Sequence, residues 1–127
     1  MIASIGAIAA GGALGAVARH FVNNGVMALA KTTFPLGIMS INILGSFVMG
    51  ALIALFAAKL DISQGWKLFL TVGFLGSFTT FSTFSLDTMT LFSRGDWVGS
   101  ATYVAASVIL SIAGVFAGSW IVWKFIA

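Results

Sequence analysis

Long stretches without a charged residue are the feature of this sequence that most restricts its fold. Residues 1–18 contain no charge, and residues 35–58 are also uncharged throughout. About 20 apolar residues are enough for an α-helix to cross a bilayer. Only 7% of the residues are charged and 60% are hydrophobic, whereas about 25% are charged in ordinary soluble domains. The sequence therefore predicts an all-α membrane protein whose surface is covered by the lipid bilayer.

Four transmembrane helices are expected in a single domain covering residues 1–127. Their approximate ranges are 3–30, 35–58, 66–93 and 97–124. The third helix is expected to be broken over residues 73–80, where glycines are followed by a run of hydroxyl side chains. Glycine weakens a helix, and serine and threonine compete for its backbone hydrogen bonds. Because every freed backbone group in lipid needs a partner in the protein or in a water-filled path, the break is a candidate ion site.

Hydroxyl and aromatic side chains are interleaved in residues 77–85, with the sequence SFTTFSTFS. On one continuous helix, Phe78, Phe81 and Phe84 would form a single stripe. Their positive ring edges and the neighbouring hydroxyl donors suit an anion, whereas the carbonyls of a broken helix suit a cation. A simpler interpretation is that the glycines allow close packing, the hydroxyls bond to carbonyls four residues earlier, and the rings pack in the core or against lipid.

Positive charge is almost equally divided between the two sides of the membrane. Orientation normally follows the excess of lysine and arginine, and here the excess is nearly zero. The side that holds both termini carries Lys59, Lys67 and Lys124, and the opposite side carries Lys31, Arg94 and, if it is counted, Arg19. This balance predicts insertion in both orientations and an antiparallel, dual-topology homodimer. The alternative is a single orientation set by a weak bias.

No group of residues typical of an enzyme is present in the sequence. The single histidine, His20, lies near a helix end, and Asp61, Asp87 and Asp96 are far apart along the chain. We find no carboxylate pair, no histidine-centred metal site and no phosphate-binding glycine loop. The absence of cysteine excludes thiolate metal sites and disulfides. We expect neither an enzyme nor a nucleic-acid partner, because the cations are scattered rather than clustered.

Three elements of the sequence resemble the Fluc (CrcB-type) fluoride channels. They are the pattern Gly-Phe-Leu-Gly-x-x-Thr-Thr-Phe-Ser-Thr-Phe-Ser at residues 73–85, Gly15-x-x-x-Arg19, and Asn42 followed by Gly45. The resemblance covers the whole chain in its length and order of spans. It implies an antiparallel homodimer in the bacterial inner membrane, with two fluoride pores and a central structural sodium ion at the dimer interface. The implied function is passive export of fluoride, which relieves fluoride toxicity.

The resemblance also implies which positions form the pore. Phe81 and Phe84 match the pore phenylalanines, and Asn42 matches the pore asparagine. The other positions that match polar groups along the ion path are Ser82, Thr83 and Tyr103.

The sodium site and the pore entrance are implied in the same way. Gly76 and Thr79 match the positions whose backbone carbonyls hold sodium, two from each subunit. Arg19 matches a vestibule arginine, which would raise the local anion concentration by long-range attraction. Two positions depart from the family pattern, because Ile38 stands where a threonine is common and Asp87 where a glutamate is common. The first departure concerns the chemistry of the pore entrance, whereas the second keeps its charge.

Two other functions are compatible with a small four-helix membrane protein. A proton-coupled exporter of cationic drugs would need a carboxylate within the membrane, and Asp87 is the only acid that could serve. The other possibility is a subunit that assembles without transporting, which would leave the hydroxyl side chains of residues 77–85 without a function.

Overall fold

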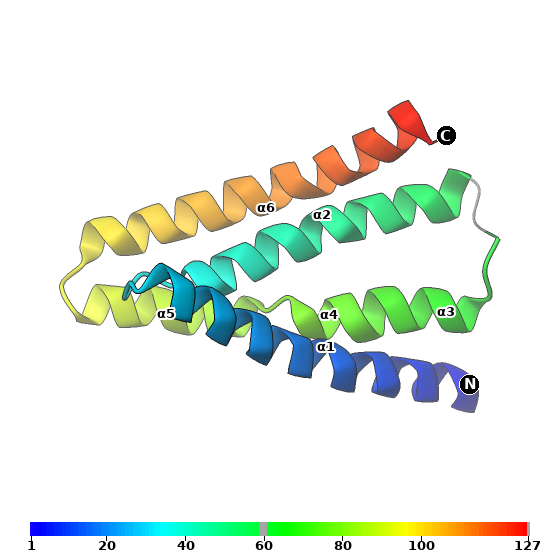
Figure 1. Cartoon of the computed structure of the whole chain (residues 1–127), viewed down its shortest axis with the longest axis horizontal. Helices are drawn as coiled ribbons and strands as arrows, with labels where there is room; N and C mark the ends of the chain where they lie inside the picture. The colour runs from blue at the N-terminus through cyan, green and yellow to red at the C-terminus, as the bar shows by residue number, and fades with distance from the viewer. Residues whose placement is uncertain (59–60, 127) are drawn as a thin grey trace.

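The computed structural model describes residues 1–58 and 61–126, which form a chain of helices (Figure 1). Lys59, one of the cations counted above, lies outside these residues. The helices are α1 (Ile2–Ala30), α2 (Leu36–Ala58), α3 (Gln64–Leu68), the π-helix η1 (Phe69–Leu75), α4 (Gly76–Phe78), α5 (Phe81–Ser93) and α6 (Trp97–Phe125). The four predicted ranges differ from α1, α2, the segment Gln64–Ser93 (α3 to α5) and α6 by at most two residues at either end.

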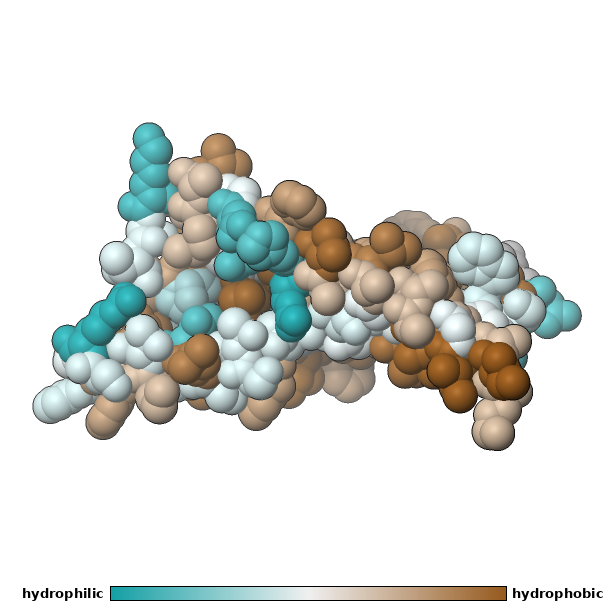
Figure 2. Space-filling model, turned by 90° about the horizontal axis from the view of Figure 1, so that it is seen from below, coloured by the Kyte–Doolittle hydropathy of each residue, from teal (hydrophilic) through white to brown (hydrophobic). Residues whose placement is uncertain are grey.

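Among the described residues, four segments are long and apolar enough to cross a membrane, as the sequence predicts: α1, α2, the segment Gln64–Ser93 and α6. Both termini lie at the same end of the molecule (Figure 1). Only 11–28% of the most apolar window of each segment is buried within the chain. In Figure 2, apolar side chains cover much of one face, and most hydrophilic side chains gather toward one end of it. The apolar surface is therefore available to lipid or to a second chain.

The helices pack as two close pairs, α1 against η1 and α4, and α2 against α6. Gly11 and Gly15 are buried in the first pair, where a methyl group at either position would collide with the backbone of Phe69 or Phe74. Their spacing of four residues predicts this close approach. Gly50 and Gly118 have the same role in the second pair, against the backbones of α6 and α2 respectively.

The segment Gln64–Ser93 leaves the helical conformation only at Thr79 and Thr80, whose ψ angles of 157° and 120° are extended. The interruption thus falls within the predicted range of 73–80 but is narrower than predicted, because Gly73 and Gly76 remain helical. The reason is packing: a Cβ atom at Gly73 would lie 2.9 Å from the Ile8 carbonyl oxygen and 3.0 Å from the Gly11 Cα. Gly73 therefore permits close contact with α1.

A buried cluster from α2, η1, α4, α5 and α6 forms the core next to these two extended residues. It includes Ile41 and Tyr103, which have no exposed surface, and the buried ring of Phe84. Phe78 is 6% exposed and stacks on Phe74 at 5.9 Å between ring centroids. The expected single stripe of Phe78, Phe81 and Phe84 is thus wrong, because Phe78 precedes the extended residues and turns into the core.

Candidate functional site

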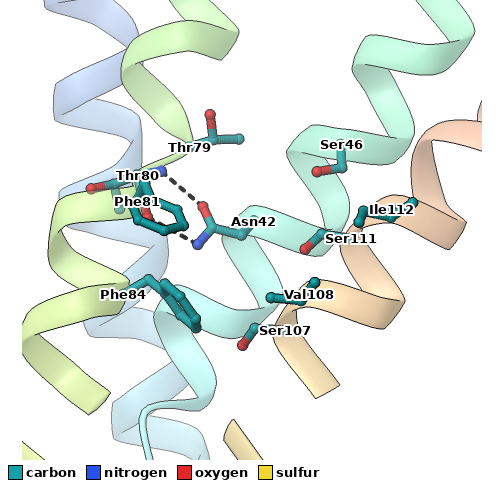
Figure 3. Close-up of a pocket in the computed structure, with 10 residues that line it drawn as sticks. All are labelled: Asn42, Ser46, Thr79, Thr80, Phe81, Phe84, Ser107, Val108, Ser111 and Ile112. Atoms are coloured by element: carbon teal, nitrogen blue, oxygen red, sulfur yellow. Dashed lines mark hydrogen bonds between the residues drawn. The ribbon is translucent and has the colours of Figure 1, made fainter. Parts of the chain in front are cut away.

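A cavity of about 320 Å³ lies where α2, α5 and α6 meet beside the extended residues. Figure 3 shows its walls, with Asn42 of α2 between the side chains of α5 and α6. The lining residues are Asn42, Ser46, Thr79, Thr80, Phe81, Phe84, Ser107, Val108, Ser111 and Ile112. None of these residues carries a formal charge, so the cavity is lined by hydroxyls, one amide and apolar side chains.

The Asn42 side chain pairs with both backbone groups of Thr80 (Figure 3). The Thr80 N–H donates to Asn42 Oδ1 at 2.8 Å, and Asn42 Nδ2 donates to the Thr80 carbonyl at 3.1 Å. The pair fixes which end of the amide carries the donors, because a backbone N–H can only donate. An asparagine amide has two N–H donors. One N–H of Asn42 therefore remains for another acceptor in the cavity.

Thr80 is also the N-cap of α5. Its hydroxyl accepts a hydrogen bond from the Thr83 N–H at 3.2 Å and donates to Thr83 Oγ1 at 3.1 Å. Threonine is a favourable N-cap because its oxygen satisfies one of the free N–H groups of the first helical turn. The cap and Asn42 together determine where α5 begins. The partly positive N-terminus of α5, at Phe81, thus lies in the wall of the cavity.

Two serines of α6, Ser107 and Ser111, also line the cavity, although they were not among the predicted site residues. Ser107 is 4% exposed, and its hydroxyl oxygen, like that of Ser111, has no hydrogen-bond partner among the described residues. A buried hydroxyl without a partner costs about 1–3 kcal/mol. Such groups point to a polar occupant of the cavity. Their spacing of four residues was the available signal, since it places both hydroxyls on one helix face.

The two predicted pore phenylalanines have different surroundings. Phe84 is 8% exposed, and its ring lies 5.2 Å from the Tyr103 ring and 5.4 Å from the Phe81 ring. Phe81 is 77% exposed although it lines the cavity. The Phe81 wall therefore faces out of the chain, and the cavity is not closed by this chain alone.

Three other residues predicted for the ion path do not line the cavity. Thr83 is engaged with the Thr80 hydroxyl, and Ser82 is exposed, with its oxygen 3.4 Å from the same hydroxyl. Tyr103 is fully buried behind Phe84, and its hydroxyl donates to Asp87 Oδ2 at 3.1 Å. The structure thus gives these side chains hydrogen-bond or packing contacts next to the cavity.

The remaining predicted residues lie at other places. Arg19 is half-buried on α1 and is absent from the cavity lining. Ile38, the position that departs from the family pattern, is 5% exposed in the core. Thr79 lines the cavity, whereas Gly76, one turn earlier on α4, is exposed. The chain thus brings Asn42, Thr79 and the two phenylalanines together, but not Arg19.

Comparison of this chain with known proteins identifies the family to which it belongs. Residues 6–119 match the family described as "CrcB-like protein, Camphor Resistance (CrcB)". The chain belongs to the CrcB family. A protein of Agrobacterium fabrum (strain C58) named "Fluoride-specific ion channel FluC" is 50% identical over 115 residues, which is 91% of this chain and 92% of the relative.

Other relatives carry the same name. One from Cereibacter sphaeroides is 49% identical over 118 residues, 93% of each chain. One from Granulibacter bethesdensis is 50% identical over 102 residues, 80% of each chain. These relatives are named as ion channels, which agrees with the prediction that this chain is not an enzyme. With its four membrane-crossing segments, this CrcB-family chain is a multi-pass protein of the bacterial inner membrane.

Proposed function

We propose that this chain forms a fluoride-selective channel that exports fluoride passively across the inner membrane and so relieves its toxicity. The observation that carries the proposal is the uncharged cavity, in which one Asn42 N–H and the Ser107 and Ser111 hydroxyls have no hydrogen-bond partner among the residues that the structure describes. Hydrogen-bond donors can replace the water that a small anion loses, and the α5 N-terminus favours negative charge. The name of the relatives, fluoride-specific ion channel, supports fluoride as the anion.

The aromatic rings would assist the same ion without trapping it. Ring edges carry partial positive charge, so Phe81 and Phe84 can attract an anion more weakly than a lysine or arginine would. Conduction requires binding that is strong enough for entry and weak enough for exit. Ser82 and Thr83 would extend the path of hydroxyls beyond the cavity, and Arg19 would attract anions at the entrance.

The functional assembly in this proposal is an antiparallel, dual-topology homodimer with two pores. The exposed Phe81 ring supports a second chain, because the wall that this residue forms needs a cover in the membrane. The large exposed apolar surface of the four spans is compatible with both lipid and a second copy.

A sodium ion at the centre of the dimer is part of the proposal. The backbone carbonyls of Gly76 and Thr79 would hold it, since carbonyls at a broken membrane helix are suitable sodium ligands. The donor set fits a hard cation, because Thr79 is extended and α4 ends at Phe78, so the last carbonyls of α4 lack their helical partners. When bound, the ion would supply positive charge that joins the carbonyls of the two chains.

The proposal predicts rapid fluoride efflux and little chloride efflux from liposomes that contain the purified protein. Vesicles loaded with potassium fluoride or potassium chloride, with valinomycin to balance charge, are followed with ion-selective electrodes. We expect Phe81→Ile to slow fluoride efflux about tenfold, as the loss of about 1.4 kcal/mol of stabilisation of the ion would do. Asn42→Ala should also slow efflux, because it removes the free N–H donor.

The matched control is Phe116→Ile on α6, since Phe116 is 72% exposed and does not line the cavity. It should conduct as the wild type does. No fluoride efflux from well-folded wild-type protein would exclude the channel.

Asp87 separates the channel from the proton-coupled exporter. In the structure its carboxylate accepts the Tyr103 hydroxyl and does not line the cavity. We expect Asp87→Asn to retain fluoride efflux, because an amide oxygen can still accept that hydrogen bond. A pH gradient across the liposomes should drive no uptake of a cationic dye such as ethidium by either protein. Dye uptake by the wild type that disappears in Asp87→Asn would support the exporter instead.

A further inference from the structure

Two backbone carbonyls near the extended residues have lost their usual helical partners. In a continuous α-helix each carbonyl accepts a hydrogen bond from the N–H four residues later. The Gly76 carbonyl would therefore accept from Thr80, and the Thr79 carbonyl from Thr83. Instead, the Thr80 N–H donates to Asn42 Oδ1 at 2.8 Å, and the Thr83 N–H donates to the Thr80 hydroxyl at 3.2 Å. Each competing donor is held by a specific side chain.

We propose that Asn42 and Thr80 are positioning residues that keep the Gly76 and Thr79 carbonyls free to bind a cation, because their side chains hold the two N–H groups that would otherwise occupy those carbonyls. This inference rests on the sodium site of the proposed function and deepens it. It assigns Asn42 a second role, in addition to its donor in the cavity, and gives Thr80 a role that the family resemblance does not supply.

The burial of Thr80 restricts the partners that its backbone N–H can find. Thr80 is 8% exposed, so its backbone N–H has little access to water and must find a partner in the protein. Without an acceptor at position 42, the nearest helical acceptor in sequence is the Gly76 carbonyl. Asn42 also donates to the Thr80 carbonyl at 3.1 Å, so a single side chain satisfies both polar groups of one extended residue.

The close contact between α2 and the extended residues allows Asn42 to reach Thr80. Gly45, about one turn after Asn42, is buried against Thr79, and a methyl group at position 45 would collide with Thr79 Cγ2. A larger residue there would push α2 away from the break. The pairing between residues 42 and 80 thus depends on the contact between Gly45 and Thr79.

The hydroxyl cap gives the first test, with sodium binding as the readout. The purified protein is unfolded by heat in detergent at increasing sodium concentration, with N-methylglucamine keeping the ionic strength constant. A cation that binds only the folded state raises the unfolding temperature. We expect Thr80→Val to raise the sodium concentration at half-maximal stabilisation about 10- to 100-fold, the usual effect of losing a group that orients a metal ligand.

Two variants control for the loss of a hydroxyl as such. Thr80→Ser keeps the cap and should retain the wild-type sodium midpoint, which is the sodium concentration at half-maximal stabilisation. Thr90→Val makes the same change on α5 at a residue whose hydroxyl donates to the Leu86 carbonyl, and it should also leave the midpoint unchanged. A wild-type midpoint in Thr80→Val, or no stabilisation of the wild type by sodium, would overturn the inference.

A pair of substitutions at position 42 tests the positioning role of Asn42. This test does not depend on whether Thr80→Val folds. Asn42→Asp keeps an oxygen that accepts the Thr80 N–H, but it loses the donor to the Thr80 carbonyl and places negative charge beside the cavity. It should therefore keep or lower the sodium midpoint while abolishing fluoride efflux. Asn42→Leu removes the acceptor and should impair both properties. Equal sodium midpoints in the two variants would contradict a positioning role for Asn42.

The same protein preparations separate this inference from the proposed channel. Fluoride efflux from wild-type liposomes, together with stability that does not respond to sodium, would overturn the positioning roles and leave the channel standing. A sodium-dependent wild type that passes no fluoride would exclude the channel, while the midpoints of the position 42 and 80 variants would still decide the positioning roles.

Discussion

Gly50→Ala is expected to destabilise the protein by about 1–3 kcal/mol, although alanine forms helices better than glycine. Gly50 is buried on α2, and a methyl group there would collide with the Val115 carbonyl of α6. A backbone carbonyl within a helix cannot rotate away as a side chain can, so the two helices would have to separate. Contacts between closely packed membrane helices would be lost along much of their length.

The measurement is the thermal unfolding temperature of the purified protein, with Gly6→Ala as the matched control. Gly6 lies within α1 and has no heavy atom within 4 Å of the position that a Cβ would occupy. Both substitutions gain the same helix propensity, so the difference between them reports the collision alone. Gly6→Ala should be as stable as the wild type or slightly more stable. Equal stability of the two variants would contradict the close approach of α2 and α6.

The spans could be predicted from the sequence because the bilayer sets their length and excludes charge. The small-residue spacing of Gly11 and Gly15 also predicted a close helix contact correctly. The interruption of Gln64–Ser93 was harder to place, because the same glycine composition favours both a break and close packing. The structure shows that Gly73 packs against α1, whereas two β-branched threonines adopt the extended conformation. Local propensity could not decide this, since the partner of Thr80 is Asn42, 38 residues away.

The cavity illustrates the same limit. Ser107, Ser111, Gly114 and Gly118 share one face of α6, and a run of small residues at this spacing is typical of a helix-packing surface. In the structure, the glycine half of this face contacts the α2 backbone around Ile43 and Phe47, and the serine half faces the cavity. Thr79 and Thr80 separate the start of α5 from the end of α4. The residues that lie opposite the serine half and the glycine half of α6 are therefore set by tertiary structure. Spacing along one helix cannot supply that information.

Phe84→Ala is expected to cost about 3–5 kcal/mol of folding stability, the usual range for truncating a buried phenylalanine. Phe84 is 8% exposed and contacts the Tyr103 and Phe81 rings. Its loss would open a space beside the cavity and free Tyr103, which would disturb the hydrogen bond from Tyr103 to Asp87. We therefore expect both the unfolding temperature and the fluoride efflux to fall.

Phe81→Ala provides the matched comparison, because it makes the same change three residues earlier at a ring that is 77% exposed. Within one chain it removes little packing, so the fall in its unfolding temperature should come only from contact with the second chain and should be smaller than the fall for Phe84→Ala. Its fluoride efflux should nevertheless be slow, since the ring edge that attracts the ion is gone. Thermal unfolding and liposome efflux of the two variants together distinguish a ring that stabilises the fold around the cavity, as expected for Phe84, from a ring that contacts the ion, as expected for Phe81. Rapid fluoride efflux through Phe81→Ala would contradict the role of this ring in the pore.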